Sequence, residues 1–420
     1  MRVLLITHPG NTVFYPLVPL AWAFRAAGHE VRVASNPEFA DTITLAGLTA
    51  VPVGRPGRAA QSAEEPAEGD VDTGLNPPYD AAEDPAKITW EHLRDGYRED
   101  VPWWFTAFTA PILADLVAYA RWWRPDLVVW EPTSYAGPIV AGACGAAHAR
   151  ALWSLDVFGV TRGHFRRLRD GRPPEDRDDA LAESFTRYGR RYGVGFTEDM
   201  ATGHFTIDLL PPSLALPTDL PRVGVRFVPY GGSASVPRWL WAPPERPRVA
   251  ITLGSSLLSE RPAEYGFDLQ DVLDSLADLD VDVVATVADR ERALLRRIPP
   301  GATIVPYVPL HALAPTCSAI VHHAGIGTLA TTSFYGVPQL ALPWEFDEPL
   351  LARNLAAQGA GLAVDPAGTT AGDIRENLLR ILREPSFKHS AERLGEEMRT
   401  MPSPLEAVRE IERRTAAHRT

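Results

Sequence analysis

Short apolar runs alternate with segments of helical apolar spacing along this chain, and no other feature constrains its fold as strongly. The first run, at residues 3–6, precedes a loop and a helical pattern at 17–27 that Gly28 closes. Similar runs recur at 31–34, 127–130, 149–153, 249–253, 281–286, 304–305, 320–321 and 339–342. Strands joined by helical crossovers form parallel sheets, so the sequence predicts an α/β protein.

The length of 420 residues exceeds what one hydrophobic core usually serves, so we expect two domains. A stretch at 229–247 is rich in Gly, Ser and Pro and is typical of a linker. We therefore predict a first domain at 1–230, a linker at 231–247, a second domain at 248–400 and a helical segment at 401–420.

Composition excludes several classes of partner. The formal charge of -12 argues against a general affinity for nucleic acid or anionic lipid, because both depend on clustered Lys and Arg. Cys144 and Cys317 are the two cysteines, which fits a reducing compartment and provides neither a disulfide framework nor a metal cluster. We find no apolar run that approaches the length of a membrane span. The sequence predicts a cytoplasmic protein with no membrane contact.

The stretch 321–361 contains a pattern suited to a diphosphate. A strand ends at 320–321, Gly325 and Gly327 permit a tight turn, and a helix begins at Thr328. Backbone N–H groups and the helix dipole at such a turn attract anions, and His323 adds a side-chain donor. Glycines before a helix also serve turn geometry alone, so the pattern leaves both interpretations open.

The order of motifs in this stretch resembles the donor-binding signature of family 1 glycosyltransferases with the GT-B fold. HHAGIGT is followed by GVPQ, by a loop from Pro343 with Asp347-Glu348, and by GAG. The segments LVPLAWAFRAAGHEVRVAS and WRPDLVVWEP are similar to the actinobacterial branch that attaches deoxysugars to macrolides and aromatic polyketides. This resemblance implies two Rossmann-like parallel-sheet domains facing a cleft, with the last helical segment packed back on the first domain.

The activity implied by the resemblance is inverting transfer of a deoxysugar from a thymidine diphosphate (TDP) sugar to a polyketide-type aglycone. The family's diphosphate contacts fall on His323, Gly327 and Thr328, and a loop with Ser255 and Ser256 also approaches the phosphates. The positions that hold the nucleotide base match Tyr307 and Val308. A half-buried strand aromatic is the alternative interpretation of the tyrosine.

Two acidic residues match a family pair, usually Asp-Gln, that binds hydroxyls of the donor sugar. These residues are Asp347 and Glu348, and the glutamate departs from the pattern. A carboxylate accepts hydrogen bonds but cannot donate them, so Glu348 would suit a sugar that presents an ammonium or only hydroxyl donors. A solvent-facing glutamate at the end of a loop is the alternative.

The family's catalytic base is missing from its usual position. Most members have a His fifteen residues before the Gly of a Gly-His pair, and counting back from Gly28 leads to Val13. The acid that orients this His matches Glu131. Valine cannot take a proton, so His8, Glu131 or Asp156 are candidate bases. Two further interpretations stay open: an acceptor that needs little activation, such as an amine or acidic phenol, and a catalytically weak or engineered chain.

The acceptor site is predicted in the first domain, lined by Val13, Phe14, Tyr15 and Trp153, whose apolar area suits a hydrophobic polyketide. Further aromatic candidates for this site are Trp103, Trp104 and Phe158. A catalytically impaired binding or auxiliary protein is the alternative function, and a sugar-nucleotide epimerase is a third. We expect neither a metal nor a cofactor, because helix-end and side-chain donors replace the cation. The resemblance leaves open an auxiliary activator protein, cytochrome-like in some relatives, and a homodimer.

Overall fold

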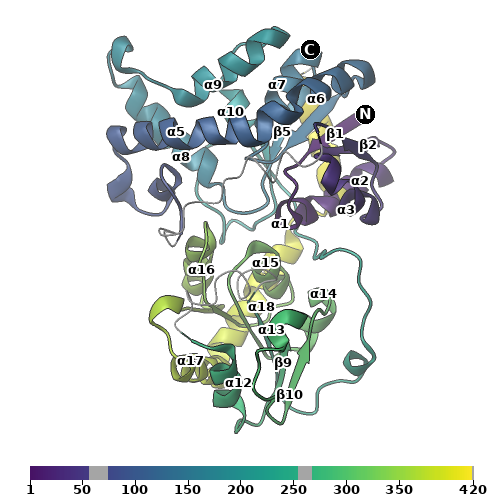
Figure 1. Ribbon diagram of the computed structural model, residues 1–420, viewed down its shortest axis with the longest axis vertical. Coiled ribbons are helices and arrows are strands. Elements are labelled where there is room, and N and C mark those ends of the chain that lie inside the picture. Colours follow the sequence, from purple (N-terminus) through teal and green to yellow (C-terminus); the bar gives the residue numbers. More distant parts are fainter. Residues whose placement is uncertain (56–73, 254–266, 419–420) are drawn as a thin grey trace. The chain divides into compact units, whose positions relative to one another are not determined.

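The computed structural model describes residues 1–55, 74–253 and 267–418 and divides the chain into two compact units. One unit combines Met1–Arg226 with Pro402–Thr420, and the other is Phe227–Met401 (Figure 1). The second unit begins inside the predicted first domain and contains the predicted linker.

The first unit is built on a seven-stranded sheet in the order β3-β2-β1-β4-β5-β6-β7. All neighbouring strands in it are parallel. The strands are β1 (Arg2–Ile6), β2 (Glu30–Ser35), β3 (Ala50–Pro52), β4 (Leu127–Trp130), β5 (Ala147–Ala151), β6 (Phe205–Asp208) and β7 (Arg222–Gly224). The strand order changes direction between β1 and β4, whose carboxyl ends therefore lie side by side. Open α/β sheets bind ligands at such a point.

Helices connect these strands. They are α1 (Asn11–Phe14), η1 (Tyr15–Leu17), α2 (Val18–Ala26), η2 (Pro37–Phe39), α3 (Ala40–Leu45), η3 (Tyr79–Ala82), η4 (Pro85–Lys87), α5 (Trp90–Trp104), the π-helix η5 (Phe105–Thr109), α6 (Ala110–Trp123), α7 (Ala136–Cys144), α8 (Val157–Asp170), η6 (Pro174–Asp176), α9 (Ala180–Gly189), η7 (Arg190–Tyr192), α10 (Asp199–Thr202) and α19 (Pro404–Ala417). Leu4 and Ile6 of β1 are buried in one core with residues of α5, α6 and α7.

The second unit has a six-stranded parallel sheet in the order β10-β9-β8-β11-β12-β13. Its strands are β8 (Arg248–Thr252), β9 (Asp282–Thr286), β10 (Ala302–Val305), β11 (Ala319–His322), β12 (Gln339–Ala341) and β13 (Gly361–Ala363). Its helices are η8 (Arg238–Trp241), α12 (Leu269–Leu276), α13 (Asp289–Arg292), α14 (Leu310–Leu313), η9 (Ala314–Thr316), α15 (Ile326–Phe334), α16 (Glu348–Ala357), η10 (Pro366–Gly368), α17 (Ala371–Arg383) and α18 (Pro385–Thr400). Two parallel sheets with helical crossovers confirm the predicted α/β class.

The last helix of the chain, α19, belongs to the first unit, where it packs against α2. Ile411 is fully buried, and His29 Nε2 lies 2.9 Å from Glu412 Oε1. The guanidinium of Arg414 lies over the ring of Phe205 in β6. A capping box between Ser403 and Glu406 starts the helix at Pro404.

One helical stretch corrects the expectation that no apolar run approaches the length of a membrane span. The continuous stretch Trp90–Trp123, formed by α5, η5 and α6, has 34 residues and an 18-residue window of mean hydropathy 1.3. Length and composition alone would allow it to cross a membrane. However, Leu93, Phe105 and Leu116 along it are 0% exposed and lie in the core of the first unit. A core helix passes the same test, so the stretch is weak evidence for a membrane segment.

Candidate active site

His8 follows the first strand and lies beside Val13. A Cβ atom placed on Gly10 would lie 3.7 Å from His8 Nε2 and 3.8 Å from Val13 Cγ2, so the imidazole and the valine border one point. The ring also packs edge-on against Phe108 of η5, with 4.6 Å between ring centroids. Burial lowers the pKa of His8, although the charge of Glu131 opposes this effect. His8 is therefore neutral at pH 7 and can accept a proton.

Val13 itself lies in a helix and not in the predicted loop, which is a correction. The chain turns at Gly10, whose extended backbone is the N-cap of α1, and Val13 and Phe14 are both buried in that helix. Phe14 is 0% exposed and packs on Phe39 with 5.5 Å between ring centroids, so it is a core residue. Tyr15 is half-buried.

Glu131 is fully buried at the end of β4, and its hydrogen bonds are local. Its carboxylate accepts from the backbone N–H of Thr133 at 2.8 Å and from the hydroxyls of Thr133 and Ser134. The backbone nitrogen of His8 lies 3.4 Å from Oε1. The imidazole Nδ1 of His8, in contrast, is buried without a hydrogen-bond partner among the described residues. In this arrangement Glu131 holds the turn after β4 and does not orient the imidazole.

Asp156 is buried in a structural position at the start of α8. One carboxylate oxygen accepts from the Gly159 N–H at 2.8 Å and caps the helix, and the other lies 2.6 Å from the Arg150 guanidinium. Asp156 is 2% exposed and Arg150 is 0% exposed. A buried guanidinium needs a counter-charge, so this carboxylate is committed to Arg150.

Replacing Asp156 by Ala is expected to destabilise the protein by about 3–5 kcal/mol, because Arg150 is left as an unpaired buried charge. Urea unfolding of the full chain measures this loss. Asp170→Ala is the matched control, because Asp170 is exposed and pairs with Arg169 on the same helix, and it should cost less than about 1 kcal/mol. If Asp156→Ala instead kept its stability and lost only turnover, the carboxylate would be a catalytic group.

An aromatic cluster near His8 joins two predicted residues, Trp103 and Trp104, to Phe108, which was not predicted. Phe108 lies 5.1 Å from Trp103 and 5.3 Å from Trp104 between ring centroids, and Trp103 is 40% exposed. Trp153 is half-buried. Sequence reasoning missed Phe108, although the run WWFTAF was visible. The π-helix that contains it inserts an extra residue per turn, a feature often found at functional sites.

Asp100 supports this aromatic cluster and was also missed. Its carboxylate accepts from the Tyr79 hydroxyl at 2.7 Å and from the Trp104 indole N–H at 3.1 Å. Burial raises the pKa of Asp100 to about 6, while these two hydrogen bonds oppose the shift. The carboxylate therefore fixes the orientation of the Trp104 ring beside Phe108.

The turn after β11 is held by His322. Its Nδ1 accepts from the Ala324 N–H at 2.9 Å, and its Nε2 lies 2.7 Å from the amide oxygen of Gln339. Burial lowers the pKa of His322 to about 3, so the ring is neutral. Ala324 has φ 71, a left-handed conformation that a side chain rarely adopts. The predicted tight turn is present, but its left-handed residue is Ala324 and neither Gly325 nor Gly327.

Gly325 is required for a different reason, the close approach of His323. A Cβ atom on Gly325 would lie 2.3 Å from His323 Nε2, so the imidazole covers this residue. Gly325 is the N-cap of α15, which begins at Ile326 and not at the predicted Thr328. His323 Nε2 thus lies at the amino-terminal end of α15, where N–H groups and the helix dipole attract anions.

The remaining predicted phosphate contacts lie in the first turn of α15 or outside the described residues. Gly327 is exposed and Thr328 is half-buried. Ser255 and Ser256 belong to the stretch 254–266, which lies outside the described residues.

The residues predicted to hold the nucleotide base differ in exposure. Tyr307 is 53% exposed, and its hydroxyl donates to the Gly231 carbonyl at 3.3 Å. Val308 is buried in an apolar cluster of the second unit. Tyr307 is thus accessible over about half of its surface, whereas Val308 is part of the core.

Asp347 and Glu348 are both buried, at 4% and 8% exposure, so Glu348 is not a solvent-facing residue. Oε2 of Glu348 accepts from the backbone N–H groups of Trp344 and Glu345, each at 3.0 Å. Oε1 lies 3.6 Å from His323 Nε2. The carboxyl group therefore joins the loop before α16 to the turn before α15.

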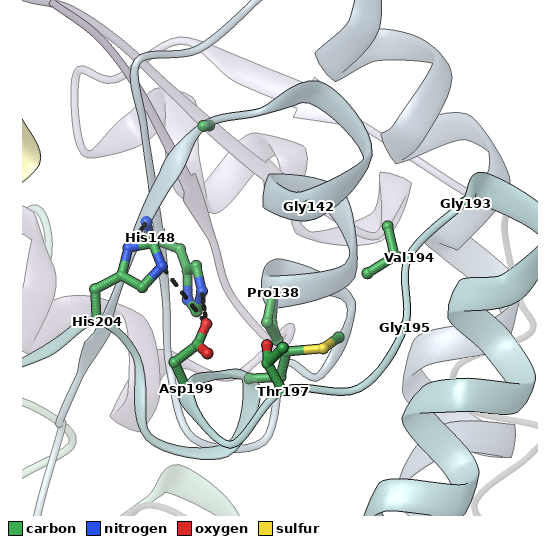
Figure 2. A pocket seen from close by; sticks show the side chains of 11 residues that line it. Pro138, Gly142, His148, Gly193, Val194, Gly195, Thr197, Asp199 and His204 are labelled. Carbon is green, nitrogen blue, oxygen red and sulfur yellow. Dashed lines mark hydrogen bonds and ion pairs between the residues drawn. The ribbon is translucent and has the colours of Figure 1, made fainter. Parts of the chain in front are cut away.

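A cavity of about 260 Å³ lies elsewhere in the first unit, beside His148, Asp199 and His204 (Figure 2). Possible ligand atoms of these three side chains all lie within 4.8 Å of one another, close enough to hold a metal ion. Asp199 Oδ2 lies 3.0 Å from His148 Nε2 and 3.5 Å from His204 Nε2. No sequence spacing signals this group, because its members come from β5, from α10 and from the residue before β6.

The hydrogen bonds of these histidines argue against metal ligation. The Trp130 indole N–H donates to His148 Nδ1 at 3.2 Å, and the His148 backbone N–H donates to His204 Nδ1 at 3.3 Å. Both Nδ1 atoms are acceptors, so the protons are on Nε2 and point toward Asp199. A metal would need those Nε2 lone pairs. The group is a hydrogen-bonded network, and the ring of His418 stacks on His204 with 4.1 Å between centroids.

Comparison with known proteins agrees with the two-unit architecture. Residues 22–254 match the family model of the erythromycin biosynthesis protein CIII-like N-terminal domain, and residues 270–413 match its C-terminal domain. The crystal structure of glycosyltransferase VinC in complex with DTDP is similar over 99% of this chain and 100% of that one, with 40% identity and a TM-score of 0.89. The spinosyn forosaminyltransferase SpnP has 39% identity and a TM-score of 0.81, with 99% of each chain covered.

Relatives that are named for a transferase activity match this chain over its full length. The 10-deoxymethynolide desosaminyltransferase of Streptomyces venezuelae is 46% identical over 100% of this chain and 98% of its own. The TDP-daunosamine transferase DnrS of Streptomyces peucetius is 42% identical over 100% of this chain and 98% of its own. The chain therefore belongs to the erythromycin biosynthesis protein CIII-like family and is a glycosyltransferase with the GT-B fold.

Proposed function

We propose that the protein moves a deoxysugar from a TDP sugar to a polyketide-type aglycone with inversion at the anomeric carbon. The observation that carries this proposal is the 46% identity, over the whole chain, with a desosaminyltransferase that acts on 10-deoxymethynolide. The names of other full-length relatives support the same classes of donor and acceptor, TDP-daunosamine in one and tylactone in another.

The donor diphosphate is proposed to bind at the start of α15, with contacts from His323, Thr328 and the backbone at Gly325 and Gly327. The imidazole of His323 lies over Gly325 and presents Nε2 at the start of α15, which supports this position for the diphosphate. Tyr307 and Val308 would hold the thymine through the exposed ring and the backbone. Ser255, Ser256 and Asp347 remain donor contacts predicted by the family resemblance.

His8 is proposed to take the proton of the acceptor. The acceptor oxygen forms a bond to the anomeric carbon while the bond from that carbon to the diphosphate oxygen breaks, and the acceptor proton goes to His8 Nε2. TDP leaves with charge that His323 and the N–H groups of α15 stabilise. His8 is favoured over Glu131 and Asp156, because the two carboxylates are buried and committed to structural hydrogen bonds.

The acceptor is proposed to lie against Val13, Tyr15 and Trp153, with Phe108 and Trp103 as additional apolar contacts. Edge contact between His8 and Phe108 supports this arrangement, since it continues the apolar surface from the proposed base. Phe14 contributes through packing alone.

TDP is expected to bind without added divalent metal, and His323→Ala should weaken this binding by about 1–3 kcal/mol, because a hydrogen bond to a charged phosphate is lost. Calorimetric titration of the full chain with TDP measures both effects. His389→Ala, an exposed histidine of α18, is the control and should bind as the wild type does. Unchanged affinity in His323→Ala would remove this residue from the donor site.

The finer features of location and assembly stay predictions. We propose a cytoplasmic location, which the two free thiols Cys144 and Cys317 support. An auxiliary activator protein and a homodimer rest on the family resemblance alone.

A further inference from the structure

Two side chains of the second unit, Glu348 and His323, form a pair that the usual Asp-Gln pattern of the family would not contain. Glu348 Oε1 lies 3.6 Å from His323 Nε2, and the side chains are 11% and 14% exposed. The contact joins the segments that follow two neighbouring parallel strands, β11 and β12. Because Nε2 also lies over Gly325, the pair is located at the start of α15.

The hydrogen bonds of Glu348 determine which oxygen can carry a proton. Oε2 accepts hydrogen bonds from two backbone N–H groups, those of Trp344 and Glu345. A proton on Oε2 would point toward other donors and would compete with these hydrogen bonds. A proton on the carboxyl group therefore belongs on Oε1, which faces His323. The same two hydrogen bonds stabilise the loop that contains Phe346 at φ 48.

The electrostatics of the pair favour a neutral acid beside a neutral imidazole. Burial, reinforced by the charges of Glu345 and Asp347, raises the pKa of Glu348 to about 8, and the two backbone N–H groups oppose this shift. Burial lowers the pKa of His323 to about 4, and the backbone of Thr252 opposes the shift only in part. At pH 7 the pair thus holds one proton, on Glu348. The neighbouring ring of His322 is neutral.

We propose that Glu348 is a positioning residue that supplies the proton for His323. In the protein without donor the proton is on Oε1 of Glu348, and it passes to Nε2 of His323 when a diphosphate binds at the start of α15. One O–H bond breaks and one N–H bond forms, so no proton is exchanged with solvent. The product is a carboxylate and an imidazolium next to the diphosphate, and the imidazolium forms an ion pair with the diphosphate that neutral His323 could not form. This inference rests on the proposed function.

The test compares TDP binding to wild-type protein and to Glu348→Gln. Glutamine keeps an oxygen for the two backbone N–H groups but has no proton to give, so His323 must take its proton from solvent. Calorimetry at pH 7.5 in two buffers of different ionisation enthalpy measures the protons taken up. When TDP binds, we expect Glu348→Gln to take up nearly one proton more than the wild type does. The dissociation constant of Glu348→Gln divided by that of the wild type should rise by up to about tenfold for each unit that the pH increases between 6 and 8. Using the ratio removes the titration of TDP itself, whose terminal phosphate ionises near pH 6.

Controls separate this role from a structural one. Glu376→Gln, on an exposed glutamate of α17 in the same unit, should behave as the wild type does. In a His323→Gln background, Glu348→Gln should no longer change proton uptake. Equal proton uptake and a constant ratio in Glu348→Gln would overturn the inference. Weaker binding of a TDP sugar with unchanged binding of TDP would also overturn it, because Glu348 would then be a sugar contact. If the wild type bound no TDP at any pH, the proposed function would fail and the pair would fail with it.

Discussion

Replacing His8 by Phe is expected to lower kcat/KM for sugar transfer by about 10²–10⁴-fold, the usual contribution of a general base. The imidazole is neutral at pH 7, because burial lowers its pKa, and it borders the same point as Val13. Wild-type activity should fall as the pH drops through the lowered pKa of His8, since protonation removes the base. The variant should lose this acidic limb of the pH profile.

The variant is expected to fold, which makes the comparison interpretable. Phe keeps the edge contact of the ring with Phe108 and removes Nδ1, a buried atom without a hydrogen-bond partner among the described residues. TDP affinity should not change. His164→Phe is the matched control, because burial and Arg167 also lower the pKa of His164, and it should retain full activity. Full activity in His8→Phe would show that the acceptor needs no base at this position.

Introducing histidine at position 13 is the second change for which we expect a large effect. In the His8→Phe background, Val13→His should recover at least tenfold of the roughly 10²–10⁴-fold loss, because the new imidazole would border the same point above Gly10. In otherwise wild-type protein, Val13→His should also raise turnover on a hydroxyl acceptor, since no described residue provides Nδ1 of His8 with the hydrogen-bond acceptor that would orient a strong base.

Steady-state turnover of a hydroxyl acceptor, with TDP affinity measured in parallel, tests this effect. Val13→Thr is the control, because threonine is similar in size to valine and has no group that takes a proton at neutral pH; it should recover no activity. If Val13→His changes nothing in either background, position 13 is not close to the reacting oxygen.

Strands were predictable where apolar side chains occupy every position. The prediction at 127–130 agrees with β4, because all four residues of Leu127–Trp130 are buried and apolar. The strand predicted at 149–153 lies earlier, at Ala147–Ala151, because the buried His148 and Arg150 interrupt its apolar pattern. The edge strands β3, β7 and β13 were missed, because each contains only one large aliphatic side chain. Strand β6 was also missed, because Thr206 and Asp208 interrupt its apolar pattern.

The candidate site was predictable where the chemistry is local. The motif HHAGIGT indicated an anion-binding turn, and the structure has His323 over Gly325 at the start of α15. The role of Asp156 was not evident, since a capping aspartate and a catalytic one are the same residue type in sequence, and only its contact with Arg150 distinguishes them. The contact of Glu348 with His323 depends on two strands pairing, which local sequence does not encode.

Product formation tests the central claim most directly. The full chain is incubated with TDP deoxysugars and with macrolide and aromatic polyketide aglycones, and mass spectrometry follows the glycoside while chromatography follows TDP. We expect one pair to yield a glycoside and an equal amount of TDP, with inverted anomeric configuration by NMR and strong dependence on His8. If the protein binds TDP sugars but neither TDP nor a glycoside ever accumulates with any aglycone, the transferase proposal is contradicted, and a binding or auxiliary role takes its place.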